Sequence, residues 1–479
     1  MNLQADLLVL LPELILAIGA MALLLTGAIG GEKTSSAINW GAIALLAAAG
    51  AAAVWLVPGE ATAFGGAFIA DGFARFAKLL ILLGAALSIL LADDFFATIK
   101  LSRFELPVLM LIATLGMMLM VSSGSFLSLY MGLELQSLAL YVLAAFNRDN
   151  LRSTEAGLKY FVLGALSSGM LLYGISFIYG FTGSVEFAAI ATVVEKTGVS
   201  LGLLFGLVFL VAGLAFKVSA VPFHMWTPDV YEGAPTPITA YFATAAKVAA
   251  LCLFLRAILM PFPEALDQWR QIIVFISVLS MALGAIAAIG QTNIKRLMAY
   301  SSIGHMGYAL LGLAAGTAYG AQGVLVYLTV YVFTNLGVFA CIQAMQRNGQ
   351  AVENISDLAG LARTDIRFAI VFSMLFLSLA GLPPLAGFLA KFYVFLAAVE
   401  AGLLVPAIIG VLASAVGLVY YLRLTKIMFF DEPAPGFDGR RHLAPRLIIS
   451  LSGAFALLLI LAPLPLVNAA GAAARALVP

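Results

Sequence analysis

The stretch AFKVSAVPFHMWTPDVYEGAPTPITA (residues 215–240) interrupts a long apolar run with a cluster of prolines. A second stretch, GLPPLAGFLAKF (residues 381–392), interrupts another long run with paired prolines and flanking glycines. Each proline removes a backbone donor, and inside a bilayer such a break is tolerated only beside protein or a water-filled cavity. Both stretches therefore predict broken helices within a membrane-embedded bundle. The residues concerned are Pro222, Pro228, Pro235, Pro237, Gly381, Pro383, Pro384 and Gly387.

The rest of the composition agrees with a membrane location. The chain has 479 residues, of which 63% are hydrophobic and 10% are charged, whereas an ordinary soluble domain is about 25% charged. Runs of about 20 apolar residues predict an all-α integral membrane protein with about fourteen transmembrane helices. We place these spans near residues 6–28, 37–57, 72–92, 105–122, 125–146, 157–181, 199–232, 236–260, 271–291, 294–315, 320–345, 367–400, 403–430 and 447–469.

The two proline-broken spans are the seventh and the twelfth, so they lie five spans apart. This spacing predicts two five-helix repeats, each with one broken helix. An odd number of spans in each repeat would make the second inverted relative to the first, as in many transporters. The expected divisions are an N-terminal three-helix segment (1–104), a first repeat (105–260, helices 4–8), a second repeat (271–430, helices 9–13) and a connecting loop with the C-terminal helix (431–479).

The distribution of basic residues predicts the orientation. The loops on one side hold Lys33, Lys100, Arg103, Arg148, Arg152, Lys295, Arg296, Arg347, Arg363, Arg367, Arg423, Lys426, Arg440, Arg441 and Arg446. The loops on the other side hold little beyond Lys196, Arg270 and Arg475. The positive-inside rule therefore places both termini outside the cytoplasm. The first apolar run has no basic residue before it, so we read it as a retained helix.

Several function classes are excluded by composition. A net charge of +1 and scattered basic residues give no surface for nucleic acid. Cys252 and Cys341 form no CxxC motif, and His224, His305 and His442 are too dispersed to suggest a metal site. No phosphate-binding glycine motif is present. We therefore expect no cofactor or metal in this chain, and any redox centre should belong to a partner subunit.

Four lysines, Lys159, Lys217, Lys247 and Lys391, interrupt apolar stretches. A charged side chain at the bilayer centre costs roughly 2.5–3.5 kcal/mol on insertion scales, so ion or proton movement is the default explanation. Lys217 and Lys391 flank the helix breaks, where snorkelling to water is the alternative. Lys247 lies about a dozen residues from either end of its span, where snorkelling is harder.

Three further groups accompany these lysines. Glu134 is the one charged residue between Glu105 and Arg148, and it is either a partner of the lysines or a hydrogen-bonded structural carboxyl. Glu155 and Lys159 are four residues apart, so they can pair on one helix face. His305 follows Ser301 and Ser302 and is interpreted as a relay, whereas His224 within the first break is interpreted as bonding freed carbonyls.

The longest motifs resemble a known family. VPFHMWTPDVYEGAPTPITA (221–240), SSIGHMGY (301–308), LAGLPPLAGFLAKFYVF (379–395) and MGLELQSLALYVL (131–143) are similar to the antiporter-like membrane subunits of respiratory complex I, the bacterial NADH:quinone oxidoreductase. The resemblance extends over essentially the whole chain. One sister subunit type of this family is expected to carry glutamate at the position of Lys391. The lysine therefore narrows the resemblance to a single subunit type.

The resemblance implies a proton-translocating subunit of a translocase enzyme. Glu134 and Lys217 would be the coupled pair of the first half-channel, Lys247 the central relay, His305 a bridge and Lys391 the loading site of the second half. Glu155 and Lys159 would lie toward a neighbour or the cytoplasmic access. NADH, FMN, iron–sulfur clusters and quinone would be held by partner subunits. The implied location is the bacterial inner membrane, among other complex I membrane subunits.

Two alternatives stay open at the level of sequence. A subunit of a multisubunit cation/proton antiporter or of a membrane-bound hydrogenase would share the broken helices and buried lysines. A non-transporting scaffold is the other alternative, but a scaffold has no need to hold charge inside the membrane.

Overall fold

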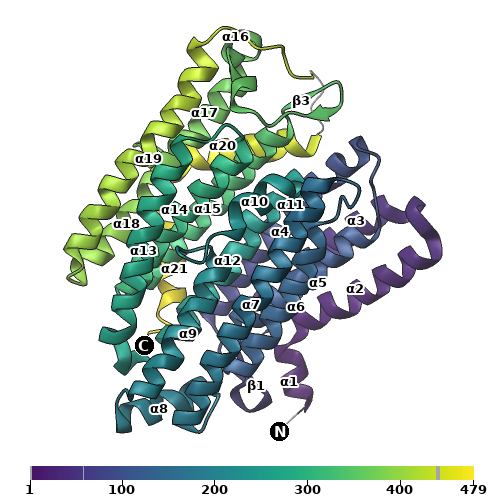
Figure 1. Cartoon of the computed structure of the whole chain (residues 1–479). Coiled ribbons are helices and arrows are strands. Elements are labelled where there is room, and N and C mark those ends of the chain that lie inside the picture. The colour runs from purple at the N-terminus through teal and green to yellow at the C-terminus, as the bar shows by residue number, and fades with distance from the viewer. Residues whose placement is uncertain (1–2, 58, 439–442, 479) are drawn as a thin grey trace.

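The computed structural model describes residues 3–57, 59–438 and 443–478, so Arg440, Arg441 and His442 lie outside the described residues. Packed helices make up most of the molecule (Figure 1). The predicted all-α class is confirmed, with two small antiparallel hairpins as the only strands in the described chain. Ten of the described helices are long and apolar enough to cross a membrane. The count of fourteen and the repeats stay predictions.

Two buried ion pairs stabilise the N-terminal segment, one within it and one that joins it to Arg256 in the part that follows. Its elements are α1 (Leu3–Val9), α2 (Leu11–Gly30), η1 (Gly31–Thr34), α3 (Ser35–Trp55), β1 (Ala61–Ala63), η2 (Phe64–Gly66), β2 (Phe68–Ala70) and α4 (Gly72–Thr98). Lys78 Nζ lies 2.7 Å from Glu13 Oε1, and Arg256 Nη2 lies 2.7 Å from Asp71 Oδ1. All four side chains are buried. Breaking such a pair by removing one partner typically costs about 3–5 kcal/mol.

The first half of the bundle, residues 105–260, contains the first predicted break. Its elements are α5 (Glu105–Val121), α6 (Phe126–Ala144), α7 (Leu151–Thr182), α8 (Phe187–Thr197), α9 (Leu201–Val218), α10 (Trp226–Gly233), α11 (Thr236–Tyr241), the π-helical turn η3 (Phe242–Ala246) and α12 (Lys247–Leu259). The connection between α7 and α9 lies outside the predicted spans, yet it forms the helix α8. This helix buries Phe187, Ile190 and Val194 on one face, which explains its formation outside a span.

The second half, residues 271–430, contains the second predicted break. The turn η4 (Pro263–Ala265) precedes this half. Its elements are α13 (Leu266–Ile289), which begins shortly before residue 271, α14 (Ile294–Ala314), α15 (Ala318–Gln343), β3 (Gln346–Arg347), β4 (Gln350–Ala351), η5 (Ile355–Leu358), α16 (Leu361–Thr364), α17 (Ile366–Ala380), α18 (Ala386–Glu400) and α19 (Leu404–Phe430). The C-terminal elements are α20 (Leu443–Leu458), η6 (Leu459–Leu461) and α21 (Leu464–Ala474). The last predicted span is therefore divided just before Pro463, whose ring cannot continue the preceding turns.

The two breaks lie where the prolines predict them, and they begin in the same way. α9 ends at Val218 and α17 at Ala380. The residues that follow, Ser219 and Gly381, are both in the left-handed conformation, with φ of 64° and 87°. In each case the backbone N–H of this residue bonds carbonyls of the last helical turn. The chain then runs without regular helix to α10 or α18. Both breaks therefore leave backbone carbonyls at the end of a helix inside the bundle.

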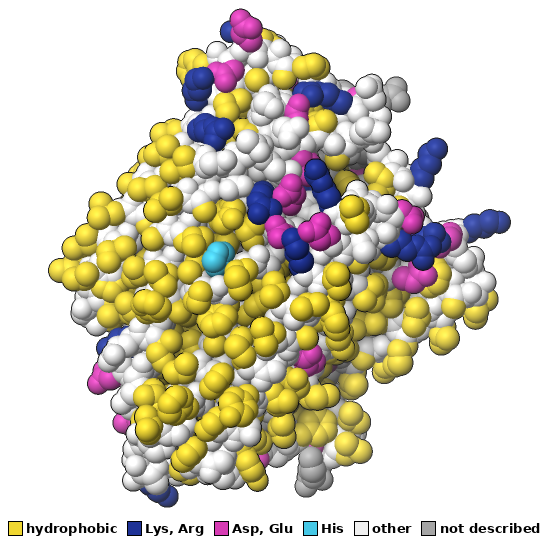
Figure 2. Space-filling view, in the orientation of Figure 1, with side chains coloured by type: hydrophobic (Ala, Val, Ile, Leu, Met, Phe, Trp, Pro, Cys, Tyr) yellow, Lys and Arg dark blue, Asp and Glu magenta, His cyan; other side chains and the backbone are white. Residues whose placement is uncertain are grey.

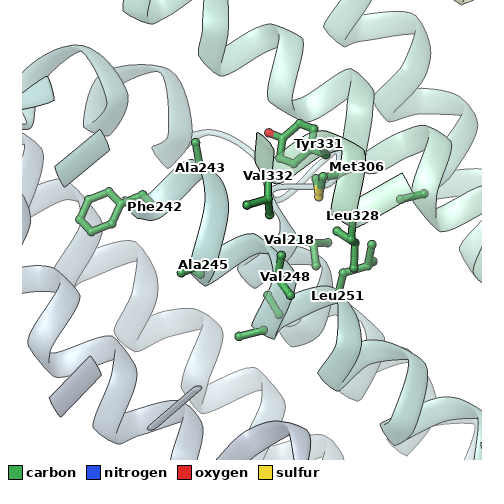
Figure 3. Packing of buried hydrophobic residues seen from close by; sticks show 14 of the residues in the cluster. Val218, Phe242, Ala243, Ala245, Val248, Leu251, Met306, Leu328, Tyr331 and Val332 are labelled. Carbon is green, nitrogen blue, oxygen red and sulfur yellow. The ribbon is translucent and has the colours of Figure 1, made fainter. Parts of the chain in front are cut away.

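The core joins the two halves. Val218, Val248 and Leu251 of the first half lie in one buried cluster with Met306 of α14 and Leu328 of α15 (Figure 3). α12 and η3 both contact α15 directly. The helix that carries Lys247 is thus enclosed by protein on every side, and its side chains from Lys247 to Leu259 are all buried.

Charged and apolar side chains separate on the surface. In Figure 2 apolar side chains cover most of the face, while lysines, arginines and acids gather mainly toward the end that holds β3 and α16. Both termini lie at the opposite end, near β1 and α8 (Figure 1). An even number of crossings would produce this placement. Which end faces the cytoplasm stays a prediction from the basic residues.

Candidate functional site

Glu134 and Lys217 lie near each other in the first half, with serine hydroxyls as their partners. Ser168 of α7 donates to Glu134 Oε1 at 2.5 Å, and Lys217 Nζ of α9 donates to Ser137 Oγ at 2.8 Å. Glu134 and Ser137 are three residues apart on α6, so they share one helix face. The two predicted partners are therefore neighbours linked through a serine, and they form no direct ion pair in the described structure.

Lys247 contacts the first helix break. Its Nζ donates to the carbonyl of Val218 at 2.9 Å and to Ser219 Oγ, and it lies 5.4 Å from the ring centre of Trp226. Thr227 Oγ1 donates to the same serine oxygen at 2.6 Å. Lys247 is 1% exposed, which excludes snorkelling. A helix end supplies the oxygen that this buried ammonium needs.

Lys391 contacts the second break in a matching way. Its Nζ donates to the carbonyl of Ala380 at 2.8 Å and to Ser414 Oγ at 2.7 Å, and it lies 4.7 Å from the ring centre of Tyr308. Ala380 immediately precedes Gly381, as Val218 precedes Ser219. Each break therefore offers the carbonyl before its left-handed residue to a buried lysine. The lysine comes from α12 at the first break and from α18 at the second.

His305 lies between two tyrosines and beside Lys391. Its Nδ1 is 2.5 Å from Tyr327 Oη, and its Nε2 is 3.2 Å from Tyr421 Oη. A cavity of about 10 Å³ is lined by His305, Tyr327, Tyr331 and Lys391 among others. Such a space is close to that of one water molecule. The histidine is thus placed to connect hydroxyl groups with the second break, whereas His224 lies half-buried in the first break.

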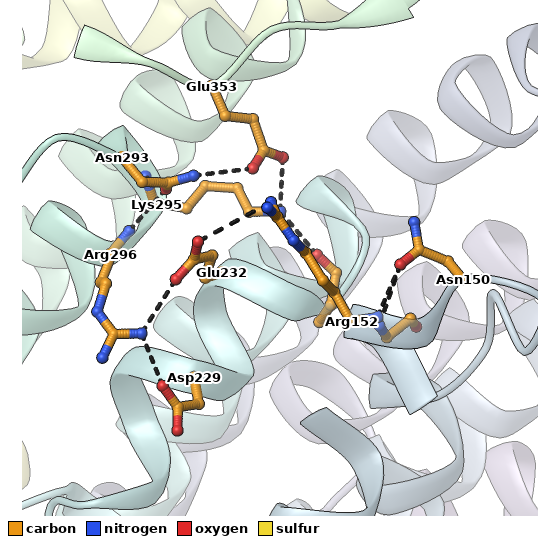
Figure 4. Close-up of polar contacts among 10 residues, drawn as sticks. Asn150, Arg152, Asp229, Glu232, Asn293, Lys295, Arg296 and Glu353 are labelled. Carbon is orange, nitrogen blue, oxygen red and sulfur yellow. Dashed lines mark hydrogen bonds and ion pairs between the residues drawn. The ribbon is translucent and has the colours of Figure 1, made fainter. Parts of the chain in front are cut away.

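Lys159 belongs to a different environment, which we call the rim cluster: Glu155, Lys159, Asp229, Glu232 and Arg296. Lys159 Nζ lies 2.7 Å from Glu155 Oε1 and 2.7 Å from Asp229 Oδ2, so the predicted helical pair is confirmed. Arg296 Nη1 of α14 lies 2.6 Å from Asp229 Oδ1 and 3.0 Å from Glu232 Oε2 (Figure 4). These side chains are partly exposed, and they join α7 and α10 of the first half to α14 of the second.

A second charged group continues inward from the rim cluster. Lys295 Nζ is 2.7 Å from Glu353 Oε1 and 2.9 Å from the carbonyl of Ala234 (Figure 4). Arg152, Glu232, Lys295 and Glu353 are among the residues lining an open cavity of about 750 Å³. Lys295 itself is 3% exposed. This cavity gives water access to the beginning of α11, two elements before Lys247.

Sequence reasoning singled out the candidate charged groups but missed their hydrogen-bond partners. Ser219 and Ser414 accept from the buried lysines Lys247 and Lys391, and Ser137 accepts from the partly buried Lys217. Ser137 could have been found from its three-residue spacing to Glu134, but Ser219 and Ser414 depend on tertiary contacts. Asp229 was visible as an acid within a broken span, and its partner Arg296 lies too far along the chain for any local signal.

The chemistry of the site is set by these partners. Within the described residues, Lys217, Lys247 and Lys391 have no carboxylate within 4.0 Å, and neutral oxygens surround their ammonium groups. An ion pair would hold each lysine in its charged form. Because no ion pair does so, protons can be added and removed here at a smaller cost. The arrangement suits charge movement.

Comparisons with known proteins give a consistent result. Residues 123–417 match the family described as NADH:quinone oxidoreductase/Mrp antiporter, TM. The NADH-quinone oxidoreductase subunit N of Parvibaculum lavamentivorans is 59% identical, covering 98% of this chain and 97% of the relative. The protein named NADH-quinone oxidoreductase subunit N 1 of Rhizobium meliloti is 57% identical, covering 99% of this chain and 98% of the relative.

Solved structures show the same architecture. A chain of respiratory complex I from Thermus thermophilus superimposes with a TM-score of 0.83 at 35% identity, covering 96% of this chain and 99% of that chain. A chain of the Mrp complex from Dietzia sp. superimposes with a TM-score of 0.86 at 23% identity, covering 100% of this chain and 98% of that chain. The second likeness shows the fold alone.

Proposed function

Because this chain belongs to the NADH:quinone oxidoreductase/Mrp antiporter family of membrane proteins, we propose that it translocates protons as a membrane subunit of an NADH:quinone oxidoreductase. The observation that carries this proposal is the placement of Lys247 and Lys391. Each binds a carbonyl freed by a helix break, together with a serine hydroxyl. Buried lysines with neutral partners at broken helices are suited to gain and lose protons.

The order of groups suggests a route. Protons would reach the rim cluster and the open cavity from the cytoplasm, and they would pass between Lys217 and Glu134 in the first half. Lys247 would be the central relay, His305 the bridge and Lys391 the loading site of the second half. Lys159 and Glu155 would act at the cytoplasmic access or toward a neighbour. Water chains would complete the route to the outer side.

The energy for this movement would come from other subunits. NADH oxidation and quinone reduction need FMN, iron–sulfur clusters and a quinone site, and we place all of these in partner subunits. The chain would lie in a bacterial inner membrane beside other membrane subunits of the complex, with both termini on the periplasmic side. Relatives above 50% identity are named subunit N of this enzyme, which favours it over a cation/proton antiporter.

Replacement of the lysines tests the proposed function. We expect Lys217→Ala and Lys247→Ala each to lower coupled quinone reduction and proton pumping by about tenfold. A tenfold loss corresponds to an activation free energy raised by about 1.4 kcal/mol. Lys426→Ala is a matched control, because that lysine is 63% exposed at the end of α19 and pairs with Asp431. If both Lys217→Ala and Lys247→Ala pump as many protons per NADH as the wild type, the proposed relay through these lysines is ruled out.

A second measurement separates the enzyme from the antiporter alternative. The native complex purified through this subunit should contain flavin and oxidise NADH. A complex that lacks both and instead exchanges sodium for protons would contradict the proposal.

A further inference from the structure

Serine hydroxyls contact four of the groups in the proposed route: Glu134, Lys217, Lys247 and Lys391. Lys217 donates to Ser137, Lys247 to Ser219 and Lys391 to Ser414, while Ser168 donates to Glu134. Each of these charge-bearing side chains therefore has a neutral hydroxyl partner. Among the four serines, Ser219 differs from the others because its backbone conformation is unfavourable for a serine.

Ser219 occupies a position that glycine would fit better. Its φ is 64°, a left-handed value that disfavours any residue with a Cβ atom. Glycine stands at the equivalent place in the second break, where a Cβ on Gly381 would lie 2.8 Å from Lys391 Cδ. At the first break the lysine arrives from α12, so the serine side chain has room. Glycine would relieve the strain at residue 219, and its absence needs another reason.

The hydroxyl of Ser219 supplies that reason. The carbonyl of Val218 can only accept a hydrogen bond, so it can hold Lys247 but cannot donate to it. A hydroxyl can accept from an ammonium and can also donate to the lone pair of a neutral amine. Thr227 Oγ1, itself fully buried, donates to Ser219 Oγ at 2.6 Å and so keeps that oxygen bonded in either arrangement.

We propose that Ser219 is a positioning residue for proton translocation, whose hydroxyl supports Lys247 in both its protonated and neutral forms. With Lys247 protonated, the ammonium donates one N–H to Val218 and another to Ser219. When the third proton leaves, the amine rotates about the Cε–Nζ bond so that its lone pair faces Ser219. The serine O–H then turns and donates to that lone pair, while one N–H still binds the Val218 carbonyl. The left-handed backbone is retained because it aims the hydroxyl at Lys247. This proposal rests on the proposed function of Lys247.

Two substitutions separate the hydroxyl from the backbone. Ser219→Ala removes the hydroxyl and keeps the strained backbone, whereas Ser219→Gly removes the hydroxyl and relieves the strain. We expect both variants to lower proton pumping by about tenfold, the effect of one lost hydrogen bond to a charged group. The glycine variant should assemble at least as well as the wild type, as measured by the flavin content and thermal midpoint of the purified complex.

Ser277→Ala is the matched control, because Ser277 is also a fully buried serine but bonds only the carbonyl of Gly307, at 2.7 Å. It should pump normally. If Ser219→Gly pumps at the wild-type rate while Lys247→Ala does not, Ser219 is only a helix cap and the inference is wrong. If Lys247→Ala also pumps normally, the proposed function fails instead. Poor assembly of the alanine variant alone leaves the glycine variant as the decisive measurement.

Discussion

At the scale of single residues, the lysines of this protein fall into two groups with different electrostatic surroundings. Lys159 touches two carboxylates at the rim, and its side chain is 41% exposed. Lys217, Lys247 and Lys391 touch neutral oxygens inside the bundle. Exposed pairs of the first kind contribute about 0–1 kcal/mol and are screened by salt. Lysines of the second kind have no carboxylate partner to stabilise the charged form.

Glu134 supplies the prediction at this scale. Its carboxylate accepts from Ser168 and lies on the same helix face as the serine that binds Lys217. We expect Glu134→Ala to lower proton pumping strongly, because the negative charge nearest Lys217 is lost. Glu134→Asp should retain part of the activity, since it keeps the charge on a shorter side chain. Pumping per NADH oxidised is the measurement.

The outcome for the alanine variant decides the role of the carboxyl. If alanine serves as well as glutamate, the carboxyl is structural and the interpretation of Glu134 as a partner of the lysines is wrong. Ser88→Ala is a useful control, because Ser88 is a fully buried serine in α4 that bonds only its own helix, at Gly84.

Single residues also show where sequence reasoning ends. A charged residue within an apolar run can be recognised from the sequence alone. Candidate site residues could therefore be predicted at Glu134, Lys217, Lys247 and Lys391. A serine in an apolar run looks like any small helix residue, and only the packing of α6 against α9 or α18 against α19 reveals a contact. The buried pairs of Glu13 with Lys78 and of Asp71 with Arg256 went unnoticed because each partner is distant in sequence.

At the scale of elements, the two helix breaks begin alike and then diverge, because the first continues into the short helix α10 and the second into the longer α18. Proline chemistry located both of them in the sequence. Proline alone could not predict which carbonyl would face which lysine, because that depends on the left-handed residue ending α9 or α17. The π-helical turn η3, directly before Lys247, carries no comparable sequence signal. The short helix α8 does carry one, because Phe187, Ile190 and Val194 recur at helical spacing.

Gly381 supplies the prediction at this scale. A Cβ at this position would lie 2.8 Å from Lys391 Cδ, and the φ of 87° disfavours any side chain. Gly381→Ala should therefore destabilise the subunit by more than the roughly 1–3 kcal/mol of a left-handed residue alone, and it should displace Lys391 and lower pumping. Thermal unfolding and pumping of the purified complex are the measurements.

Gly402 is the matched control for this variant. Its φ is 79°, yet no atom lies within 4 Å of the Cβ that alanine would add. Gly402→Ala thus carries the backbone cost without the collision. Equal losses of stability and equal pumping in the two variants would show that Lys391 tolerates displacement. Glycine at position 381 would then be required only for its backbone angle.

At the scale of the whole molecule, the sequence predicted the features that depend on one segment but not those that depend on packing between segments. The membrane location, the helical class and the positions of both breaks could be read from the sequence, because each depends on composition within one segment. The rim cluster could not, since Asp229 and Arg296 meet only when α10 packs against α14. The structure places both termini at one end of the bundle, as an even number of crossings requires (Figure 1).

The orientation of the bundle in the membrane can be measured, because the two native cysteines do not interfere. Cys252 and Cys341 are fully buried, so a maleimide that cannot cross membranes should leave the unmodified chain unlabelled. Glu195→Cys lies exposed in α8, at the end of the termini, and Gln350→Cys lies exposed in β4, at the charged end. From the excess of basic residues at the end that holds β3 and α16, we predict that this end faces the cytoplasm. Reagent applied from the periplasm should therefore label Glu195→Cys at once and Gln350→Cys only after the inner membrane is opened. The reverse pattern would show that the proposed proton route runs in the opposite direction through the same residues.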